Sequence, residues 1–318
     1  MSGSSLLPSA SPQPSDTPVS LNPERPVDRP LTILQVVPRL GIGGVERGTI
    51  EIAEAVVEAG GRALVASEGG QLAARLMRAG AELVEMNAAT KNPFNIWQNA
   101  GVLERLIHSE GVDVVHARSR APAWSAKWAA ERARIPFVTT YHGSYSEGFP
   151  GKRFYNSVMA AGRPVIAVSE HIRTLVAERH RVPADQIVVI PRGADTDVFS
   201  EDVVGGARTA GLAERWGLLD DPRPIIMLPG RLTRWKGGES VIDAAALLAE
   251  RRGAATGQPD FIVLFVGDDA GSGFAGTLEK RIRARGVGHF VHLAGAVTDM
   301  AAAYKLASIV ISASTEPE

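Results

Sequence analysis

Short continuous apolar segments recur along the chain from Leu31 onward, and helical patterns separate most of them. Before residue 200, buried strands are predicted at 31–37, 62–66, 82–85, 112–116, 136–141, 165–168 and 187–190. Between the first two, apolar positions from Val45 to Ala59 step by three and four, as along one face of a helix. Strands that alternate with helices indicate βαβ units and a parallel sheet covered on both faces.

This alternation is interrupted between residues 200 and 223, where glycines, acidic residues and prolines surround one short amphipathic helix. A second series follows, with strands predicted at 224–229, 261–266, 290–293 and 308–312 and helices near 238–251, 275–286 and 299–306. The predicted fold class is α/β, with two doubly wound Rossmann-type domains that face a cleft. The predicted parts are a disordered Ser- and Pro-rich tail at 1–30, a first domain at 31–199, a linker at 200–223 and an incomplete second domain at 224–318.

Composition narrows the classes of protein and of site. The 34 basic and 35 acidic residues give a net charge of -1, which argues against a nucleic-acid-binding protein. The chain contains no cysteine, and this excludes a disulfide framework, a thiolate metal site and a cysteine nucleophile. No apolar run reaches the roughly 18 residues that a membrane-spanning helix needs. Because a signal-peptide pattern is also lacking, we expect a cytoplasmic protein.

In doubly wound sheets, ligands bind beyond the carboxyl ends of the strands, so candidate chemistry is sought where a strand leads into a helix. The first such place contains Gly41, Gly43 and Gly44. Glycine N–H groups before a helix can bind an anion, and the helix N-terminus favours negative charge. The spacing is not a dinucleotide fingerprint, because Glu46 replaces its third glycine, nor a P-loop, because no lysine precedes Thr49. The alternative is a glycine turn that only lets strand and helix pack closely.

A second candidate follows the first strand of the second series, in PGRLTRWKGG (229–238). Arg231 and Lys236 lie there in a short loop just before a helix. Two cations beside a helix N-terminus can neutralise a diphosphate without a metal. The alternative is a pair of solvated loop cations.

Two histidines stand at predicted strand ends, His116 in DVVHARS and His142 in TTYHGS. A histidine so placed can polarise a hydroxyl or bind a substrate oxygen. Gly143 favours this interpretation for His142, because glycine permits a close approach by substrate. The alternative is that each histidine has a structural role within the fold.

Two further patterns have strong structural explanations. Asp195 and Asp197 have the spacing of a divalent-metal pair, but aspartates in such turns usually bond their own backbone. We therefore expect neither a metal nor another cofactor. Trp124 and Trp128 share one helix face, which favours packing against the protein, while cations at its rim suit contact with a membrane surface.

With these segments located, the chain from Leu31 to Glu318 resembles the family 4 glycosyltransferases, which are retaining enzymes with the GT-B fold. GIGGVERGTIEIAEAVVEAGGRALVAS resembles the family's opening strand-to-helix region, and DVVHARSRAPAW and PFVTTYHG resemble its acceptor-side strand ends. VIAVSEHIR and IVVIPRGADTDVF resemble the signature that closes the first domain, and GRLTRWKG resembles the donor-phosphate loop. VGDD and HLAGAVTDMAAAYKLASIVISAS match the later part of the second domain.

This resemblance implies roles for particular residues. Arg231 and Lys236 would bind the donor diphosphate and stabilise the leaving nucleotide, and His142 would lie beside the transferred sugar. These three are the expected catalytic residues. The donor side would further include Gly43, Gly44, Gly267, Val297 and Glu318, and the acceptor side would include His116, Arg118 and Gly143.

The chain departs from the family's pattern in two places. The family reads Pro-Asn-Gly before the aspartate, whereas Arg192 stands here in place of the asparagine and adds a cation. The family also carries Glu-x7-Glu near the point where this chain ends, and Glu318 corresponds to the first glutamate. Because doubly wound sheets commonly have about six strands and the second series has fewer, we expect a truncated copy. The alternative is a natural protein with a small second domain.

The implied function is metal-independent transfer of a sugar from a nucleotide-diphosphate sugar to a hydroxyl of a glycan or glycolipid, with retention of configuration. We expect a role in envelope polysaccharide or lipopolysaccharide synthesis. We also expect peripheral contact with the inner face of the membrane through the Trp124 and Trp128 helix and Lys152–Arg153. Two other functions stay open, a sugar-nucleotide epimerase of the same fold and a catalytically inactive binding protein. The broken glycine pattern disfavours a dehydrogenase.

Overall fold

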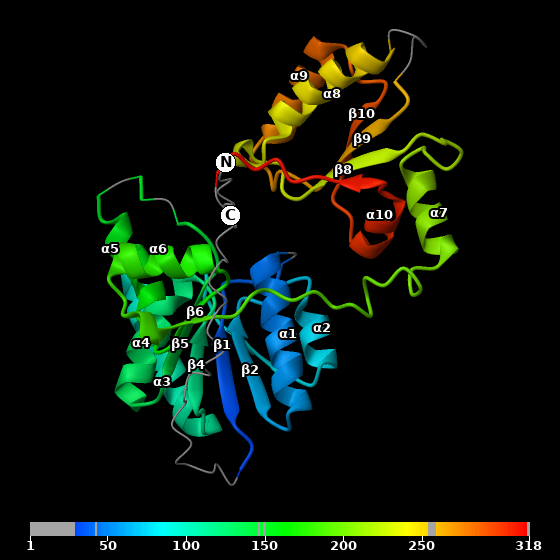
Figure 1. Cartoon of the computed structure of the whole chain (residues 1–318). Coiled ribbons are helices and arrows are strands. Elements are labelled where there is room, and N and C mark those ends of the chain that lie inside the picture. Colours follow the sequence, from blue (N-terminus) through cyan, green and yellow to red (C-terminus); the bar gives the residue numbers. More distant parts are fainter. Residues whose placement is uncertain (1–28, 42, 146, 149, 254–258, 317–318) are drawn as a thin grey trace, which may run out of the picture. The chain divides into compact units, whose positions relative to one another are not determined.

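The computed structural model describes residues 29–41, 43–145, 147–148, 150–253 and 259–316 (Figure 1). The chain divides into two compact units, and the division falls between Arg192 and Gly193. Each unit contains one parallel sheet, as the α/β prediction of two doubly wound sheets requires. Within the described ranges, no helix is long and apolar enough to cross a bilayer.

The sheet of the first unit has the strand order β3-β2-β1-β4-β5-β6-β7. Its strands are β1 (Thr32–Val36), β2 (Arg62–Ser67), β3 (Glu82–Glu85), β4 (Val114–Ala117), β5 (Phe137–Tyr141), β6 (Val165–Ala167) and β7 (Ile187–Val189). Its helices are α1 (Gly44–Glu58), α2 (Ala73–Arg78), α3 (Pro93–Glu110), α4 (Arg120–Ala133), α5 (Lys152–Ser157) and α6 (Glu170–His180). The strand order reverses between β1 and β4, which makes this pair the switch point where such sheets bind ligands.

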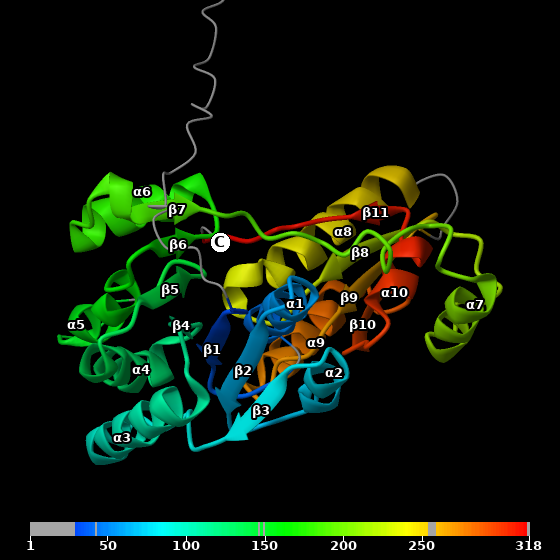
Figure 2. The same cartoon turned by 90° about the horizontal axis from the view of Figure 1, so that it is seen from below.

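Alternate residues of the central strands supply two separate cores. On β2, Leu64 and Ala66 belong to the core beneath α3 and α4, whereas Ala63 and Val65 belong to the core beneath α1 and α2. The two helical layers lie on opposite sides of the sheet in Figure 1 and Figure 2. Each central strand is therefore apolar on both faces, which explains why the sequence shows continuous apolar runs rather than alternation.

The second unit repeats this arrangement with the strand order β10-β9-β8-β11. Its strands are β8 (Ile225–Pro229), β9 (Ile262–Val266), β10 (Val291–Gly295) and β11 (Ile309–Val310). Its helices are α7 (Gly206–Arg215), α8 (Gly238–Gly253), α9 (Phe274–Arg285) and α10 (Met300–Leu306). On β9, Val263 and Phe265 face the core of α8 and α9, while Leu264 and Val266 face the core of α10 and α7.

Helix α7 lies within the segment 200–223, which the sequence analysis interprets as a linker. Val204, Leu212 and Leu218 of this segment are buried in one core with α10. Arg208 donates hydrogen bonds of 2.8 and 2.7 Å to the two carboxylate oxygens of Asp299, just before α10. The segment is packed against the second unit because the apolar face of α7 needs a partner.

The predicted strands appear close to their expected bounds. At 308–312, only Ile309 and Val310 pair with β8. These two side chains are 53% and 47% exposed, because β11 stands at the end of the described strand order.

Three glycines with positive φ mark the carboxyl ends of neighbouring strands: Gly230 (131°), Gly267 (155°) and Gly295 (74°). The N–H of Gly267 donates to the carbonyl of Gly295 at 2.8 Å. A Cβ on Gly267 would lie 2.0 Å from the carbonyl oxygen of Gly230. The backbone of the next strand thus occupies the space that a side chain at 267 needs.

Gly267→Ala is expected to destabilise the second unit by about 2–4 kcal/mol, because a strained φ adds to a clash with a backbone atom. Urea or thermal unfolding of the full chain measures this. Gly211→Ala on α7 is the matched control, since a Cβ there meets nothing within 4 Å. Alanine at this helical position should stabilise by about 0.5–1 kcal/mol. Equal stability of the two variants would contradict the steric explanation for Gly267.

Candidate functional site

The switch point of the first sheet is flanked by the start of α1, which follows β1, and by Arg118, which follows β4. Gly43 is the N-cap of α1, and no side chain of a described residue caps this end of the helix. The Glu46 carboxylate folds back over Gly43. The first backbone N–H groups of α1 form the positive end of the helix dipole, and the Glu46 carboxylate offsets part of that charge.

Two of the glycines predicted on this edge, Gly44 and Gly143, are not required by the local fold, whereas a Cβ on Gly43 would lie 2.1 Å from a carboxylate oxygen of Glu46. None of these three residues, Gly43, Gly44 and Gly143, has a φ in the left-handed region. A Cβ at Gly143 would meet nothing within 4 Å, and a Cβ at Gly44 would meet Arg192 Nη1 at 3.8 Å. This favours the interpretation that the surface is open and lets a ligand approach. It disfavours the alternative, in which packing requires a glycine turn.

Arg118 and Arg192 converge on Gly48 of α1. A Cβ at Gly48 would lie 2.8 Å from Arg118 Nη2 and 2.9 Å from Arg192 Nη2. Arg192 Nη1 donates a 2.7 Å hydrogen bond to the carbonyl of Gly44, and Arg192 Nη2 lies 3.5 Å from a carboxylate oxygen of Glu51. Burial, followed by the charge of Arg192, lowers the pKa of Arg118 to about 10, and Glu51 opposes this shift. Arg118 nevertheless carries its charge at neutral pH.

The two predicted histidines lie in the same region, and both are neutral. His116 Nε2 is 2.8 Å from the hydroxyl of Thr140. Burial, followed by the charges of Arg118 and Arg192, lowers the pKa of His142 to about 3. Burial, followed by Arg118 and His142, likewise lowers the pKa of His116 well below its usual value. Within the described part of the chain, the buried His142 Nε2 has no hydrogen-bond partner.

In the second unit, the loop after β8 brings Lys236 back to the strand end. Lys236 Nζ would lie 4.0 Å from a Cβ on Gly230, and it lies 4.6 Å from the centre of the Trp235 ring. The loop ends at Gly237 (φ 72°), where a Cβ would clash with the carbonyl oxygen of Ala313. Gly238 then begins α8. The ammonium group, the end of β8 and the N-terminus of α8 are thus within one short loop.

Other predicted donor-side residues lie along the same strand ends. Arg231 is exposed directly after Gly230. Val297 follows β10 and packs half-buried against the core of α10. The buried Thr233 hydroxyl in the loop has no hydrogen-bond partner among the residues described. The glycine at 267 is explained by packing, so its donor-binding role stays a prediction, and Glu318 lies outside the described residues.

The aspartate pair forms a turn, as its structural interpretation predicts. Asp195 Oδ1 accepts hydrogen bonds of 3.1 Å from the backbone N–H groups of Asp197 and Val198. Across the described ranges, no three His, Asp or Glu side chains are grouped as metal ligands would be.

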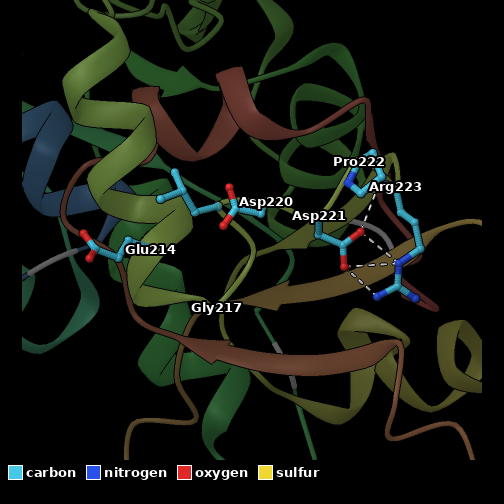
Figure 3. Close-up of a pocket in the computed structure, with 7 residues that line it drawn as sticks. Glu214, Gly217, Asp220, Asp221, Pro222 and Arg223 are labelled. Carbon is cyan, nitrogen blue, oxygen red and sulfur yellow. Dashed lines mark hydrogen bonds and ion pairs between the residues drawn. The ribbon is translucent and has the colours of Figure 1, made fainter.

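A hollow of about 730 Å³ lies at the opposite, amino end of β8, between α7 and the strand (Figure 3). Glu214, Asp220, Asp221 and Arg223 are among its lining residues. In Figure 3, Asp221 turns toward Arg223, with which it forms a 2.7 Å ion pair. A hollow with this excess of carboxylates repels a diphosphate, so it does not compete with the loop after β8 as a donor site.

The comparisons with known proteins cover both units. The family model "Glycosyltransferase Family 4" matches residues 42–198, and "Glycosyl transferases group 1" matches residues 214–318. The chain belongs to glycosyltransferase family 4. A D-inositol 3-phosphate glycosyltransferase of Xylanimonas cellulosilytica is 32% identical over 181 residues, which cover 50% of this family 4 chain. That match spans 43% of the relative's length.

Solved structures agree with this assignment. A glycosyltransferase from Rickettsia africae is 36% identical to this chain with a TM-score of 0.77. The match covers 91% of this chain and 74% of the Rickettsia protein. The Anabaena protein HepE, solved in complex with UDP and glucose, is 22% identical with a TM-score of 0.74, and the match covers 91% of this chain and 75% of HepE. The family 4 chain therefore has the GT-B fold with two Rossmann-like units.

The structure brings the predicted residues together in two sets. In the first unit, His116, Arg118 and His142 gather near the α1 N-terminus, and in the second unit Arg231 and Lys236 share one loop. The contribution of Gly48 and Glu51 cannot be read from the local sequence. Both residues contact Arg192. The sequence singles out Arg192 only because it stands where the family pattern has an asparagine.

The histidine pKa values predict a pH dependence of stability. Unfolded His142 takes up a proton near pH 6.5, whereas the folded side chain resists protonation down to about pH 3. Its contribution to stability is therefore full above pH 6.5 and is lost as the pH falls toward 3. Urea unfolding between pH 7 and 4 should show a shallower loss of stability in His142→Gln than in the wild type. The control His108→Gln, at the exposed end of α3, should keep the wild-type slope. A His142→Gln slope equal to that of the wild type would contradict the buried, neutral imidazole.

Proposed function

We propose that the chain carries out retaining glycosyl transfer, moving a sugar from a nucleotide-diphosphate sugar to a hydroxyl without a metal. The observation that carries this proposal is the loop after β8. There Lys236 and Arg231 stand beside the end of β8 and the N-terminus of α8, and both charges suit a diphosphate. The Anabaena protein of the same fold was solved with UDP and glucose, which supports a nucleotide-sugar donor.

The chemistry asked of these residues is stabilisation of a departing diphosphate. The bond between the anomeric carbon and the phosphate oxygen breaks, and a bond to the acceptor oxygen forms on the same face. The acceptor proton passes to the leaving phosphate oxygen, so the step needs no protein nucleophile. Negative charge grows on the phosphate as the bond breaks, and nearby fixed cations lower the barrier most at that moment.

The first unit would serve the acceptor and the transferred sugar. His142 is neutral, and its Nε2 has no partner among the described residues, so it can hydrogen-bond a sugar hydroxyl. Gly143 leaves room beside it, since a Cβ there meets nothing within 4 Å. We propose a glycan or glycolipid acceptor of envelope polysaccharide or lipopolysaccharide synthesis, at the cytoplasmic face of the membrane.

Lys236→Ala is expected to lower kcat by about 100- to 1,000-fold, because the leaving diphosphate loses a preorganised cation. The matched control is Arg234→Ala in the same loop, whose guanidinium instead pairs with Glu239 at 3.6 Å. Arg234→Ala should retain most of the activity. Transfer of radiolabelled sugar from UDP-, GDP- and ADP-sugars to a membrane-lipid extract measures both variants. An unchanged kcat in Lys236→Ala would remove this lysine from the reaction.

Product analysis in the same assay separates the other functions. Free nucleotide with an epimerised sugar and no dependence on acceptor would identify an epimerase. Nucleotide binding without turnover of any donor would identify a binding protein.

Membrane contact is a further part of the proposal, and its best support is one exposed aromatic side chain. Phe154 on α5 is 71% exposed, and its ring lies 5.1 Å from that of Trp124. Trp124 itself packs against the first core and donates to the carbonyl of Tyr155 at 3.3 Å. The exposed ring next to Lys152 and Arg153 therefore suits an anionic membrane surface better than the tryptophans do.

Phe154→Ser is expected to weaken binding to vesicles of anionic phospholipid by about tenfold, because the ring no longer enters the interface. Flotation at low salt measures the bound fraction. Phe94→Ser is the control, since Phe94 on α3 is also exposed at 61% and stacks on Trp97. If the wild type does not float with the vesicles, or if both variants lose binding equally, the proposed contact through Phe154 is wrong.

A further inference from the structure

Arg118 is an unusual arginine because it is almost completely buried without full pairing. Only 2% of its surface is exposed, and charged side chains are rarely buried this far unless they are paired. Its buried Nε has no hydrogen-bond partner in the described part of the chain. The Nε–H group of a charged guanidinium is thus held at the carboxyl end of β4 with unused hydrogen-bonding capacity.

Arg192 brings a second guanidinium to the same point from the end of β7. Both groups lie against Gly48, at 2.8 and 2.9 Å from the position of a Cβ on that residue. Any side chain at 48 would displace them, so glycine at this position lets the two cations meet. Arg192 is itself held there by the carbonyl of Gly44 at 2.7 Å.

The surroundings leave positive charge in excess at this point. Glu51, at 3.5 Å from Arg192, is the acid that acts on both arginines. The other acid of this turn, Glu46, lies over Gly43. His116 and His142 are neutral, so they neither add to the charge nor compensate it. Two adjacent guanidinium groups repel each other. An anion bound between them attracts both groups and offsets this repulsion.

We propose that Arg118 and Arg192 form an oxyanion subsite of the first unit that binds a phosphate group of a substrate. That the phosphate belongs to a glycosyl-transfer substrate rests on the proposed function, whereas the subsite rests on the geometry of the two arginines. Guanidinium forks match phosphate oxygens in pairs, which a lysine cannot do. His116, which the resemblance assigns to the acceptor side, interacts electrostatically with Arg118, and this favours a phosphorylated acceptor. A donor diphosphate offers the same chemistry.

The test observes the subsite directly, through the Nε–H resonance of Arg118 in the full chain. This resonance is assigned through its bonds to the Arg118 backbone, and inorganic phosphate is titrated at constant ionic strength with chloride. We expect a saturable shift in the wild type. Arg192→Asn should weaken the apparent affinity by about tenfold, and Arg192→Lys should weaken it less. Arg192 is partly exposed, so these substitutions leave the core intact.

Arg173→Gln is the matched control, because it removes an exposed arginine of the same unit that pairs with Glu170 at 2.6 Å. It should titrate like the wild type. The absence of a saturable shift would overturn the subsite. So would an equal affinity in Arg192→Asn and the wild type, or a response that chloride alone reproduces.

Two pairs of probes identify the source of the phosphate. A shift with glucose 6-phosphate but not with glucose or UDP supports the subsite and assigns it to the acceptor. A shift with UDP but not with uridine or glucose 6-phosphate supports it and assigns it to the donor. The readout is independent of turnover: Lys236→Ala should lower transfer by about 100- to 1,000-fold and leave the phosphate response of Arg118 unchanged. A chain without transferase activity but with this response would contradict the proposed function alone.

Discussion

Every strand pair described in the two sheets is parallel, and this constraint organises the rest of the molecule. Parallel strands need a crossover for each connection, so helices cover both faces of the sheet and both faces must be apolar. Few polar side chains fit inside such strands, and charged groups such as Arg118 lie beyond the strand ends. Because all strands of a sheet point the same way, their carboxyl ends share one edge, and polar residues far apart in sequence are collected there.

Much of the fold can be predicted from the sequence for this reason. Segments such as 112–116 and 261–266 are short, continuous and apolar, which is typical of strands buried on both faces. Helix α7 is harder to place, because its few apolar residues, Leu212 among them, stand between glycines and acidic residues. Whether such a segment packs or links is decided by the partner surface on α10, and the local sequence does not contain that information.

The candidate site is only partly predictable. Strand-end histidines and the loop of Lys236 can be found because each is a local pattern. The proximity of Arg118 to Arg192 depends instead on strand order, since Arg118 follows β4 and Arg192 follows β7. Their meeting point, Gly48, stands in the second turn of α1, where the local sequence gives no sign of a neighbour.

The glycines show why sequence patterns alone do not separate packing from binding. Gly237 and Gly267 need positive φ values and have carbonyl oxygens where a Cβ would be. Gly44 and Gly143 have neither constraint. All four stand at strand-to-helix turns, and only their surroundings distinguish a glycine that the backbone requires from one that leaves room for another molecule.

Arg192 is also the last residue of the first unit, and its guanidinium is fastened to α1 through Gly44 and Glu51. This attachment gives the position a mechanical meaning. A tension applied along the chain beyond Gly193 is resisted by the contacts of Arg192 with α1 before it reaches the short strand β7, which ends at Val189. The side chain thus adds a point of attachment at this edge of the sheet, beside the backbone hydrogen bonds between β6 and β7.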